Sequence, residues 1–244
     1  MDVFATLLHD SPGAGTVPDV DAHRSALARP DGWAVGPLVV GDERLSGLDA
    51  DVDVSVLTSG GAGSVEALAR RASALRLVAV ETVLRDLDDL ATAAARVVAA
   101  ASGLPDGVEV FVGLPDGSRL VDAVELVEAA GLQGRLDLAP RRGVAEQMSV
   151  LVEADLPFKV TGAGDDALGP YGVIALLMAV EALVDGADPQ DAEQLLAHPD
   201  ETRSRLALST WDEPQQARVR RRLRGVDSPD VVNVLERLGG AGLL

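Results

Sequence analysis

One lysine stands alone in a sequence that otherwise carries its positive charge on arginine. Lys159 is the only lysine among the 21 basic residues of the 244-residue chain. Arginine stays protonated and cannot form a Schiff base, whereas a lysine desolvated in a protein interior can lose its proton near neutral pH. We therefore expect Lys159 to be an amine nucleophile or an electrostatic stabiliser. The alternative is a lysine that extends its charge to the rim of the fold and pairs with Asp165 or Asp166.

Carboxylates are expected at the same end of the fold as this lysine. Glu81 ends the run LVAVE, Asp137 lies inside RLDLA, and Asp165 with Asp166 follows the lysine segment. The apolar neighbours of Asp137 predict a side chain that faces the interior or the outer helix layer, where a buried carboxylate needs a partner. We assign Glu81 or Asp137 as general acid/base and Thr161 as a hydroxyl relay or substrate contact. A Mg²⁺ site, or ordinary solvated and ion-paired acids, are the alternatives.

A glycine-rich turn, TSGGAGS, joins a predicted strand to a predicted helix. Its residues Gly60, Gly61, Gly63 and Ser64 would present backbone N–H groups to an anion such as phosphate. Their spacing fits neither the Walker loop nor the dinucleotide-binding fingerprint. The alternative is a flexible turn in which Ser64 caps the following helix.

Metal and cofactor chemistry finds little support in the sequence. His9, His23 and His198 are scattered, and none has metal-ligand spacing with another. The absence of cysteine excludes thiolate catalysis and cysteine-ligated metals, and the 2% aromatic content leaves few rings for stacking on a cofactor or a base. We predict no metal and no cofactor.

Charge limits the partners of the chain. The formal net charge is -18, from 39 acidic and 21 basic residues, and this negative field repels nucleic acid and acidic membrane surfaces. The first residues lack the basic start of a signal peptide, and the apolar run from Val173 to Val180 is interrupted by Glu181. We therefore expect a cytoplasmic protein with no nucleic-acid or membrane partner.

The arginine-rich run RVRRRLR, from Arg218 to Arg224, predicts a basic helical stripe. It could dock an acidic partner. The interpretation that we favour is a surface helix with structural ion pairs to acids near it in sequence, among them Asp212, Glu213 and Asp227.

The elements that must position these residues alternate between strand and helix patterns, which is typical of parallel βαβ units. The runs VSVL, LVAV and VFVG are continuously apolar, so these strands should be covered on both faces, as a parallel sheet requires. Six strands are predicted: WAVGPLVV from Trp33, VDVSVLT from Val52, LRLVAVE from Leu75, VEVFVGL from Val108, RLDLA from Arg135 and LPFKVTG from Leu156. Helices are predicted at about residues 64–74, 86–101, 118–130, 144–154 and 171–184.

The length of the chain and its repeated units predict a (β/α) TIM-like barrel, although an incomplete barrel is an alternative. Two weaker strand candidates, VFATLL from Val3 and LALSTW from Leu206, would raise the number of strands to eight, and either could be helical. We expect residues 1–188 to form the barrel-like core. Residues 189–244 would form a helical C-terminal elaboration packed on the same domain.

The segment EADLPFKVTGAG around Lys159 resembles the Schiff-base strand of deoxyribose-phosphate-type class I aldolases, which has a Phe-x-Lys-Thr-x-Thr-Gly pattern. The resemblance covers a few residues. It implies a Schiff-base role for Lys159, but those aldolases use a second lysine and this chain has none.

A longer resemblance is to a family of mostly actinobacterial proteins of uncharacterised function with a Phe-Lys-x-Thr-x-Gly-Leu-His-His motif. Phe158, Lys159 and Thr161 match it, and the likeness extends loosely to WAVGPLVVGDERLSGL and YGVIALLMA. It implies a (β/α) barrel. The paired histidines of the motif fall on Asp165 and Asp166, a later histidine falls on Tyr171, and an asparagine falls on Ala175.

Two functions are compatible with these observations. The first is a lyase or aldolase-like enzyme that acts on a small oxygenated metabolite through Lys159. The second is a catalytically silent barrel that serves as a binding or assembly partner, in a homo-oligomer or beside a paralogue that keeps the histidines. The missing histidines favour the second function.

Overall fold

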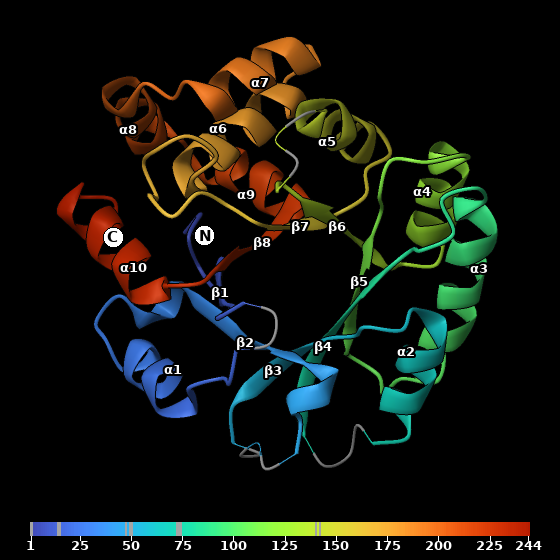
Figure 1. Ribbon diagram of the computed structural model, residues 1–244. Coiled ribbons are helices and arrows are strands. Elements are labelled where there is room, and N and C mark those ends of the chain that lie inside the picture. The colour runs from blue at the N-terminus through green and yellow to red at the C-terminus, as the bar shows by residue number, and fades with distance from the viewer. Residues whose placement is uncertain are drawn as a thin grey trace.

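The computed structural model describes residues 2–13, 16–46, 48, 51–71, 75–139, 141 and 143–244. The strands form one closed barrel in which neighbours follow sequence order and every pair is parallel (Figure 1). The predicted (β/α) barrel is therefore confirmed, and it is complete. The strands are β1 (Leu8–Asp10), β2 (Val35–Gly41), β3 (Asp53–Leu57), β4 (Arg76–Val83), β5 (Glu109–Gly113), β6 (Gln133–Asp137), β7 (Phe158–Thr161) and β8 (Leu223–Ser228).

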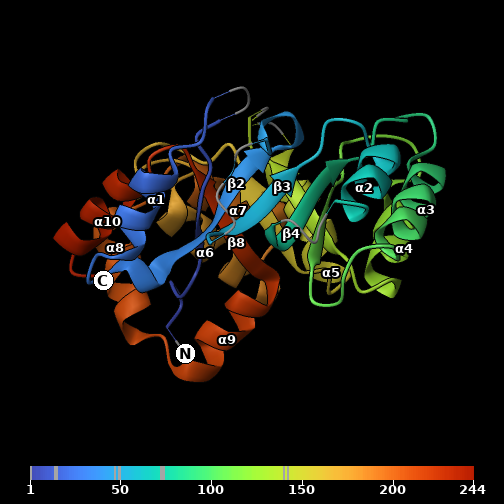
Figure 2. The ribbon, with the colours of Figure 1, turned by 90° about the horizontal axis from the view of Figure 1, so that it is seen from below.

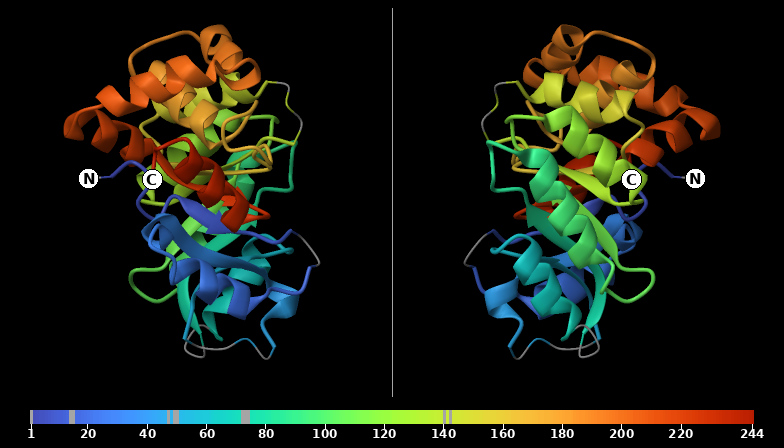
Figure 3. Two further views of the ribbon diagram at one scale, coloured as in Figure 1. Left: turned by 90° about the vertical axis from the view of Figure 1, so that its left-hand side faces the viewer. Right: turned by 90° about the vertical axis from the view of Figure 1, so that its right-hand side faces the viewer.

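Helices surround the barrel, and α6 to α8 gather on the flank opposite α1 (Figures 1 and 3). They are α1 (Val20–Leu27), α2 (Ala62–Ala69), α3 (Leu90–Ala101), α4 (Leu120–Ala129), α5 (Val144–Glu153), α6 (Val173–Val184), α7 (Pro189–Ala197), α8 (Glu201–Thr210), α9 (Glu213–Arg222) and α10 (Val231–Gly240). Two short 3-10 turns are η1 (Gly32–Ala34) and η2 (Asp42–Arg44). All five predicted helices are present, with bounds that differ by a few residues.

The six clear strand patterns correspond to β2 through β7, and the predicted parallel order is confirmed. The two weaker candidates have different outcomes. β1 begins at Leu8, where the candidate VFATLL ends, whereas the candidate LALSTW lies mostly in α8. The eighth strand is LRGVDS, in a region where we expected only helices.

The C-terminal residues 189–244 are consequently part of the barrel, and not only a helical elaboration. β8 pairs with β7 on one side and β1 on the other, so it closes the cylinder. Its sequence alternates Leu223, Gly225 and Asp227 with Arg224 and Val226, and it presents no continuous apolar run. A strand whose inward face carries a glycine and an acid lacks the pattern from which buried strands are predicted.

The basic stripe belongs to α9 and β8, and four of its arginines are ion-paired, as we favoured, whereas the half-buried Arg220 donates to backbone carbonyls of Leu223 and Ala5. Arg221 donates to Asp155 at 2.6 Å, and Arg218 pairs with Asp185 at 3.1 Å. The acids expected from sequence proximity have other roles: Asp212 caps α9, and Asp227 lies inside the barrel. Figure 2 shows α9 at the same end of the barrel as the N-terminus.

The hydrophobic core fills the space between the strands and the helices. It is built mainly of Val, Leu and Ala, as the composition requires. Within the part of the chain that the structure describes, none of the helices combines the length and the apolar character needed to span a bilayer.

The identity of the eighth strand gives a stability prediction. Val226 of β8 is fully buried, whereas Leu206 of α8 is 67% exposed. Val226→Asp places an unpaired charge in the core and should lower the free energy of unfolding by more than about 3 kcal/mol. Leu206→Asp should change it by less than about 0.5 kcal/mol. Urea denaturation of both variants measures the difference, and equal effects would contradict the placement of β8.

Candidate active site

Lys159 of β7 lies inside the barrel with a fully buried side chain, where it contacts two carboxylates. Its Nζ atom is 2.6 Å from Glu81 Oε1 of β4 and 2.6 Å from Asp227 Oδ1 of β8. Side chains of a strand alternate between the two faces, so a residue faces the barrel interior at every second position. The register pairs Lys159 with Gly225, and Asp227 is the next residue of β8 on the same face.

Glu81 is held by two further partners. Ser55 Oγ of β3 donates to Oε1 at 2.7 Å, and Arg135 Nε of β6 lies 3.0 Å from Oε2. Arg135 is the register partner of Lys159 on the neighbouring strand, so both cations approach Glu81 from adjacent strands. Phe111 of β5 adds an aromatic face, with its ring centroid 5.5 Å from the ammonium nitrogen.

His9 of β1 completes the interior cluster. Its Nδ1 atom is 3.1 Å from Lys159 Nζ and 3.8 Å from Asp227 Oδ1. Two glycines make room for the ring. A Cβ atom on Gly225 would lie 2.4 Å from His9 Nε2, and one on Gly36 would lie 2.7 Å from Cδ2. The position of His9 therefore depends on β2 and β8 having no side chain there.

The environment of Lys159 makes it a resting ammonium ion, contrary to our expectation of an amine that burial neutralises. Burial alone lowers the pKa of Lys159, but the attraction of Asp227 and Glu81 outweighs it and raises the pKa above its ordinary value. The amine can therefore act as a nucleophile only after one of its partners takes a proton.

The two carboxylates respond differently although both are 2.6 Å from the ammonium group. Burial opposes ionisation of Glu81, but Lys159 and Arg135 together hold its pKa below the usual range. Burial raises the pKa of Asp227 to about 6, because Lys159 only partly compensates and the charge of Glu81 repels it. Burial and the charge of Lys159 lower the pKa of His9 well below its ordinary value, so the imidazole is neutral.

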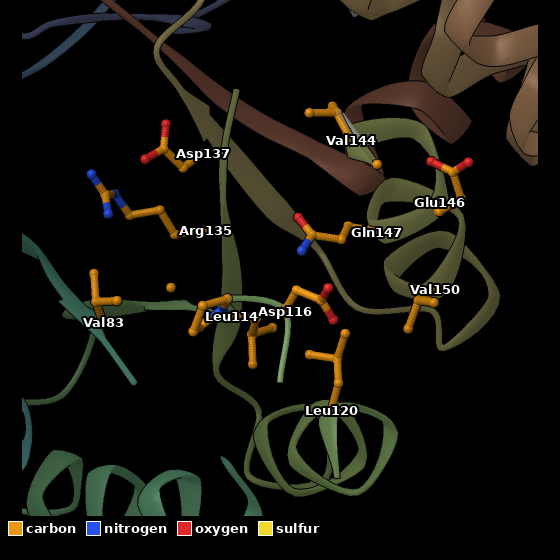
Figure 4. Close-up of a pocket in the computed structure, with 13 residues that line it drawn as sticks. Val83, Leu114, Asp116, Leu120, Arg135, Asp137, Val144, Glu146, Gln147 and Val150 are labelled. Carbon is orange, nitrogen blue, oxygen red and sulfur yellow. The ribbon is translucent and has the colours of Figure 1, made fainter. Parts of the chain in front are cut away.

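Two clefts lie beside the cluster and share Val83 and Arg135 in their linings. The larger, of about 930 Å³, extends toward α4 and α5 and contains Asp116, Asp137 and Glu146 (Figure 4). The smaller, of about 430 Å³, is lined by residues of β2 and β3 and by the segments that follow β1 and β3. Lys159 contributes to neither lining, so Arg135 is the part of the cluster that solvent reaches.

Two of the predicted catalytic residues lie apart from the ion-paired cluster. Asp137 is exposed, lines the larger cleft, and accepts a hydrogen bond from the N–H of Ala139 at 2.9 Å. The expectation of a buried Asp137 was wrong, because β6 ends at this residue and its side chain reaches the open mouth. Thr161 is its register partner on β7 and is half-buried. Of the four residues that we predicted to be catalytic, Lys159 and Glu81 are the two that form a contact in the buried cluster.

The rim pairing proposed for Lys159 is also wrong. Asp166 instead pairs with Arg237 at 3.1 Å, and the backbone carbonyl of Asp165 accepts from Asn233. Full burial places the ammonium group away from both acids.

The predicted anion loop, with Gly60, Gly61, Gly63 and Ser64, lies between β3 and α2 next to the smaller cleft. α2 begins at Ala62 with Gly61 as its N-cap, so Ser64 lies inside the helix and is not the cap. The lining of the smaller cleft includes Thr58 and Ser59 but stops short of these four residues.

Sequence reasoning missed Asp227, His9, Arg135 and Ser55. Each is a polar residue inside a short strand. A polar residue at such a position was the one feature of the sequence that could have pointed to them. Within the described ranges, no three histidine or acidic side chains are arranged to bind a metal ion. Comparison of the sequence with protein-family models found no match, and comparison with curated proteins found none either.

The ion cluster predicts a specific pattern of stability losses. Lys159→Met leaves two carboxylates buried without their cation and should destabilise the protein by about 3–5 kcal/mol at pH 7. Adding Glu81→Gln and Asp227→Asn should recover a large part of the loss. Lys159 lowers the pKa of Asp227, which is about 6 in the parent, so its removal raises that pKa further. The folded variant then takes up a proton at a pH where the parent does not, and the deficit of Lys159→Met should shrink as the pH falls toward about 6. Denaturant unfolding across pH measures this, and a pH-independent deficit would argue against the ion pairs.

The space around His9 gives a second prediction. Gly225→Ala would push a methyl group into the imidazole and should cost about 1–3 kcal/mol of stability. The matched control is Gly239→Ala in α10, where an added Cβ meets nothing within 4 Å. Thermal unfolding of the two variants compares them, and equal stability would show that His9 does not occupy this space.

Proposed function

We propose that the chain is a lyase or aldolase-like enzyme that forms a Schiff base between Lys159 and a small oxygenated carbonyl compound. The observation that carries the proposal is the position of Lys159 at the centre of the barrel, with Glu81 and Asp227 each 2.6 Å from its nitrogen and His9 at 3.1 Å. An amine nucleophile needs proton acceptors within hydrogen-bond reach, and these three side chains supply them.

The free energy that is needed to bury these charged side chains supports a functional role for the cluster. A buried ion pair gains little over well-packed apolar residues of similar volume, because desolvation offsets the attraction. The interiors of such barrels are ordinarily packed with Val, Ile and Leu. Stability alone therefore does not account for Lys159, Glu81 and Asp227 at the centre, whereas acid/base chemistry requires such groups.

Each residue has a role in this proposal. Lys159 adds to the carbonyl carbon, and Glu81 takes a proton from the ammonium group and returns it to the hydroxide that leaves as water. Asp227 stabilises the resulting iminium ion, and the neutral His9 is a second acceptor for a proton on Nζ. The resemblance of the strand to the Schiff-base strand of class I aldolases agrees with this assignment.

A silent barrel that acts as a binding or assembly partner is the second candidate, and one observation favours it. Lys159 is fully buried and lines neither cleft, so a carbonyl compound reaches it only after Arg135 or a neighbouring side chain moves. In that case the cluster is a structural counter-charge network.

Reductive trapping separates the two functions, because Lys159 and the N-terminus carry the only primary amines of the chain. Folded protein is incubated with small aldehydes and keto acids plus borohydride, and adducts are located by peptide mass spectrometry. We expect an adduct at Lys159 that forms faster in folded protein than in the same chain unfolded in urea. Adducts at the N-terminus alone in folded protein, with Lys159 modified only after unfolding, would favour the silent barrel.

A further inference from the structure

We propose that Arg135 binds an oxyanion of the substrate, and that the substrate is a small carbonyl compound with a phosphate or carboxylate at one end and hydroxyl groups at the other. This inference deepens the proposed function and rests on it for the carbonyl group. The anion site itself is argued from the two clefts and from the unsatisfied donors of Arg135.

Arg135 has hydrogen-bonding capacity that the folded chain does not use. Its Nε atom lies 3.0 Å from Glu81 Oε2, yet neither of these buried atoms has an aligned hydrogen bond. Among the described residues, its terminal Nη atoms donate no hydrogen bond, and Glu81 is the ion-pair partner of the guanidinium group. A planar guanidinium group with free donors is suited to bidentate contact with a carboxylate or phosphate.

The side chain of Arg135 lies where a ligand can reach it from two directions. It is 12% exposed, and with Val83 it belongs to the linings of both clefts. In Figure 4 the guanidinium group of Arg135 lies at one side of the larger cleft, and α4 and α5 lie at the opposite side. A ligand that contacts Arg135 can therefore extend from one cleft into the other.

The two clefts differ in the charge of their linings, and this difference determines which end of the ligand lies in which cleft. Among the described residues, the lining of the larger cleft has three acids, Asp116, Asp137 and Glu146, and one basic residue, Arg135. An anion is repelled there, whereas the carboxylates can accept hydrogen bonds from hydroxyl groups. The larger cleft consequently suits the hydroxyl-bearing end.

The smaller cleft suits the anionic end. Among the described residues that line it, Glu43 is the only acid, and Ser11, Thr58 and Ser59 carry hydroxyl groups beside the charge of Arg135. The hydroxyl of Thr58 already donates to the backbone carbonyl of Glu81, which leaves those of Ser11 and Ser59 for an anion. Its volume of about 430 Å³ accommodates a phosphate or carboxylate group with a few further atoms.

Binding of an anion at Arg135 has a chemical consequence for the buried cluster. The guanidinium charge is one of the two that keep Glu81 ionised, and an oxyanion would draw it away. Glu81 would then accept a proton from the Lys159 ammonium group across their 2.6 Å contact. The neutral amine adds to the carbonyl carbon, and one of its N–H protons passes to the carbonyl oxygen to give a hydroxyl group. The C–O bond then breaks as the proton on Glu81 joins the departing hydroxide to form water, which leaves the iminium ion and an ionised Glu81.

Calorimetric titration with inorganic phosphate tests the anion site without any carbonyl chemistry. We expect millimolar binding by the parent, weakened about tenfold or more in Arg135→Gln because a charge-assisted pair is lost. Glu43→Gln should tighten binding, since it removes the acid of the smaller cleft. Asp116→Asn, in the larger cleft, should have a smaller effect than Glu43→Gln. Arg205→Gln on α8 makes the same charge change outside both clefts and is the matched control.

The outcomes separate this inference from the proposed function. Equal phosphate affinity in Arg135→Gln and Arg205→Gln, or no binding by the parent, would overturn the Arg135 site even if borohydride traps an adduct at Lys159. Phosphate binding that depends on Arg135, without any adduct at Lys159, would keep the anion site and overturn the enzyme. If Arg135→Gln does not fold, the comparison of Glu43→Gln with Asp116→Asn decides, and a larger gain in Asp116→Asn would contradict the assignment of the smaller cleft.

Discussion

The ammonium group of Lys159 is the constraint on which the barrel interior depends. A cation without water needs nearby opposite charge, and here that charge comes from β8, which pairs with β7, and from β4, which reaches the lysine across the barrel interior. The contact with Asp227 exists only if β8 pairs with β7 in the observed register. Closure of the barrel therefore supplies one of the two carboxylates that contact the lysine. The residues after position 188 contribute this carboxylate and the eighth strand, so they belong to the core.

The sequence predicted much of the fold because short strand-like runs, three of them continuously apolar, alternate with helical patterns between β2 and β7. It also singled out Lys159 and Glu81, which the structure brings into contact. It missed β8, because only Leu223 and Val226 among its six residues are apolar and they are not adjacent, so no strand-like run is visible. His9 and Asp227 were missed for a related reason: their importance comes from contacts between the first and last strands, which are 218 positions apart, from residue 9 to residue 227.

The unequal behaviour of Glu81 and Asp227 shows how neighbours beyond the first contact determine the chemistry of a buried acid. Both lie 2.6 Å from the same ammonium nitrogen. Glu81 has Arg135 and Ser55 in addition, so its charged form is favoured, whereas Asp227 has a neutral His9 and the repulsion of Glu81. The cluster therefore contains one acid that is firmly ionised and one that titrates near pH 6. A reaction that moves protons needs such a difference, because two equivalent acids would compete for the same role.

The positions at which this chain departs from the Phe-Lys-x-Thr motif bear on whether an activity could survive. Asp166 pairs with Arg237, and the Tyr171 hydroxyl donates to Glu193 while its ring packs against Arg141. These contacts lie in the loop after β7 and its neighbours, and none of them involves the buried cluster. An activity that required histidines at these positions would be lost from this chain. Schiff-base chemistry at Lys159 would not depend on them, because its proton acceptors, Glu81, Asp227 and His9, come from β4, β8 and β1. The departures from the motif therefore weigh against a shared family reaction more than against a reaction at Lys159.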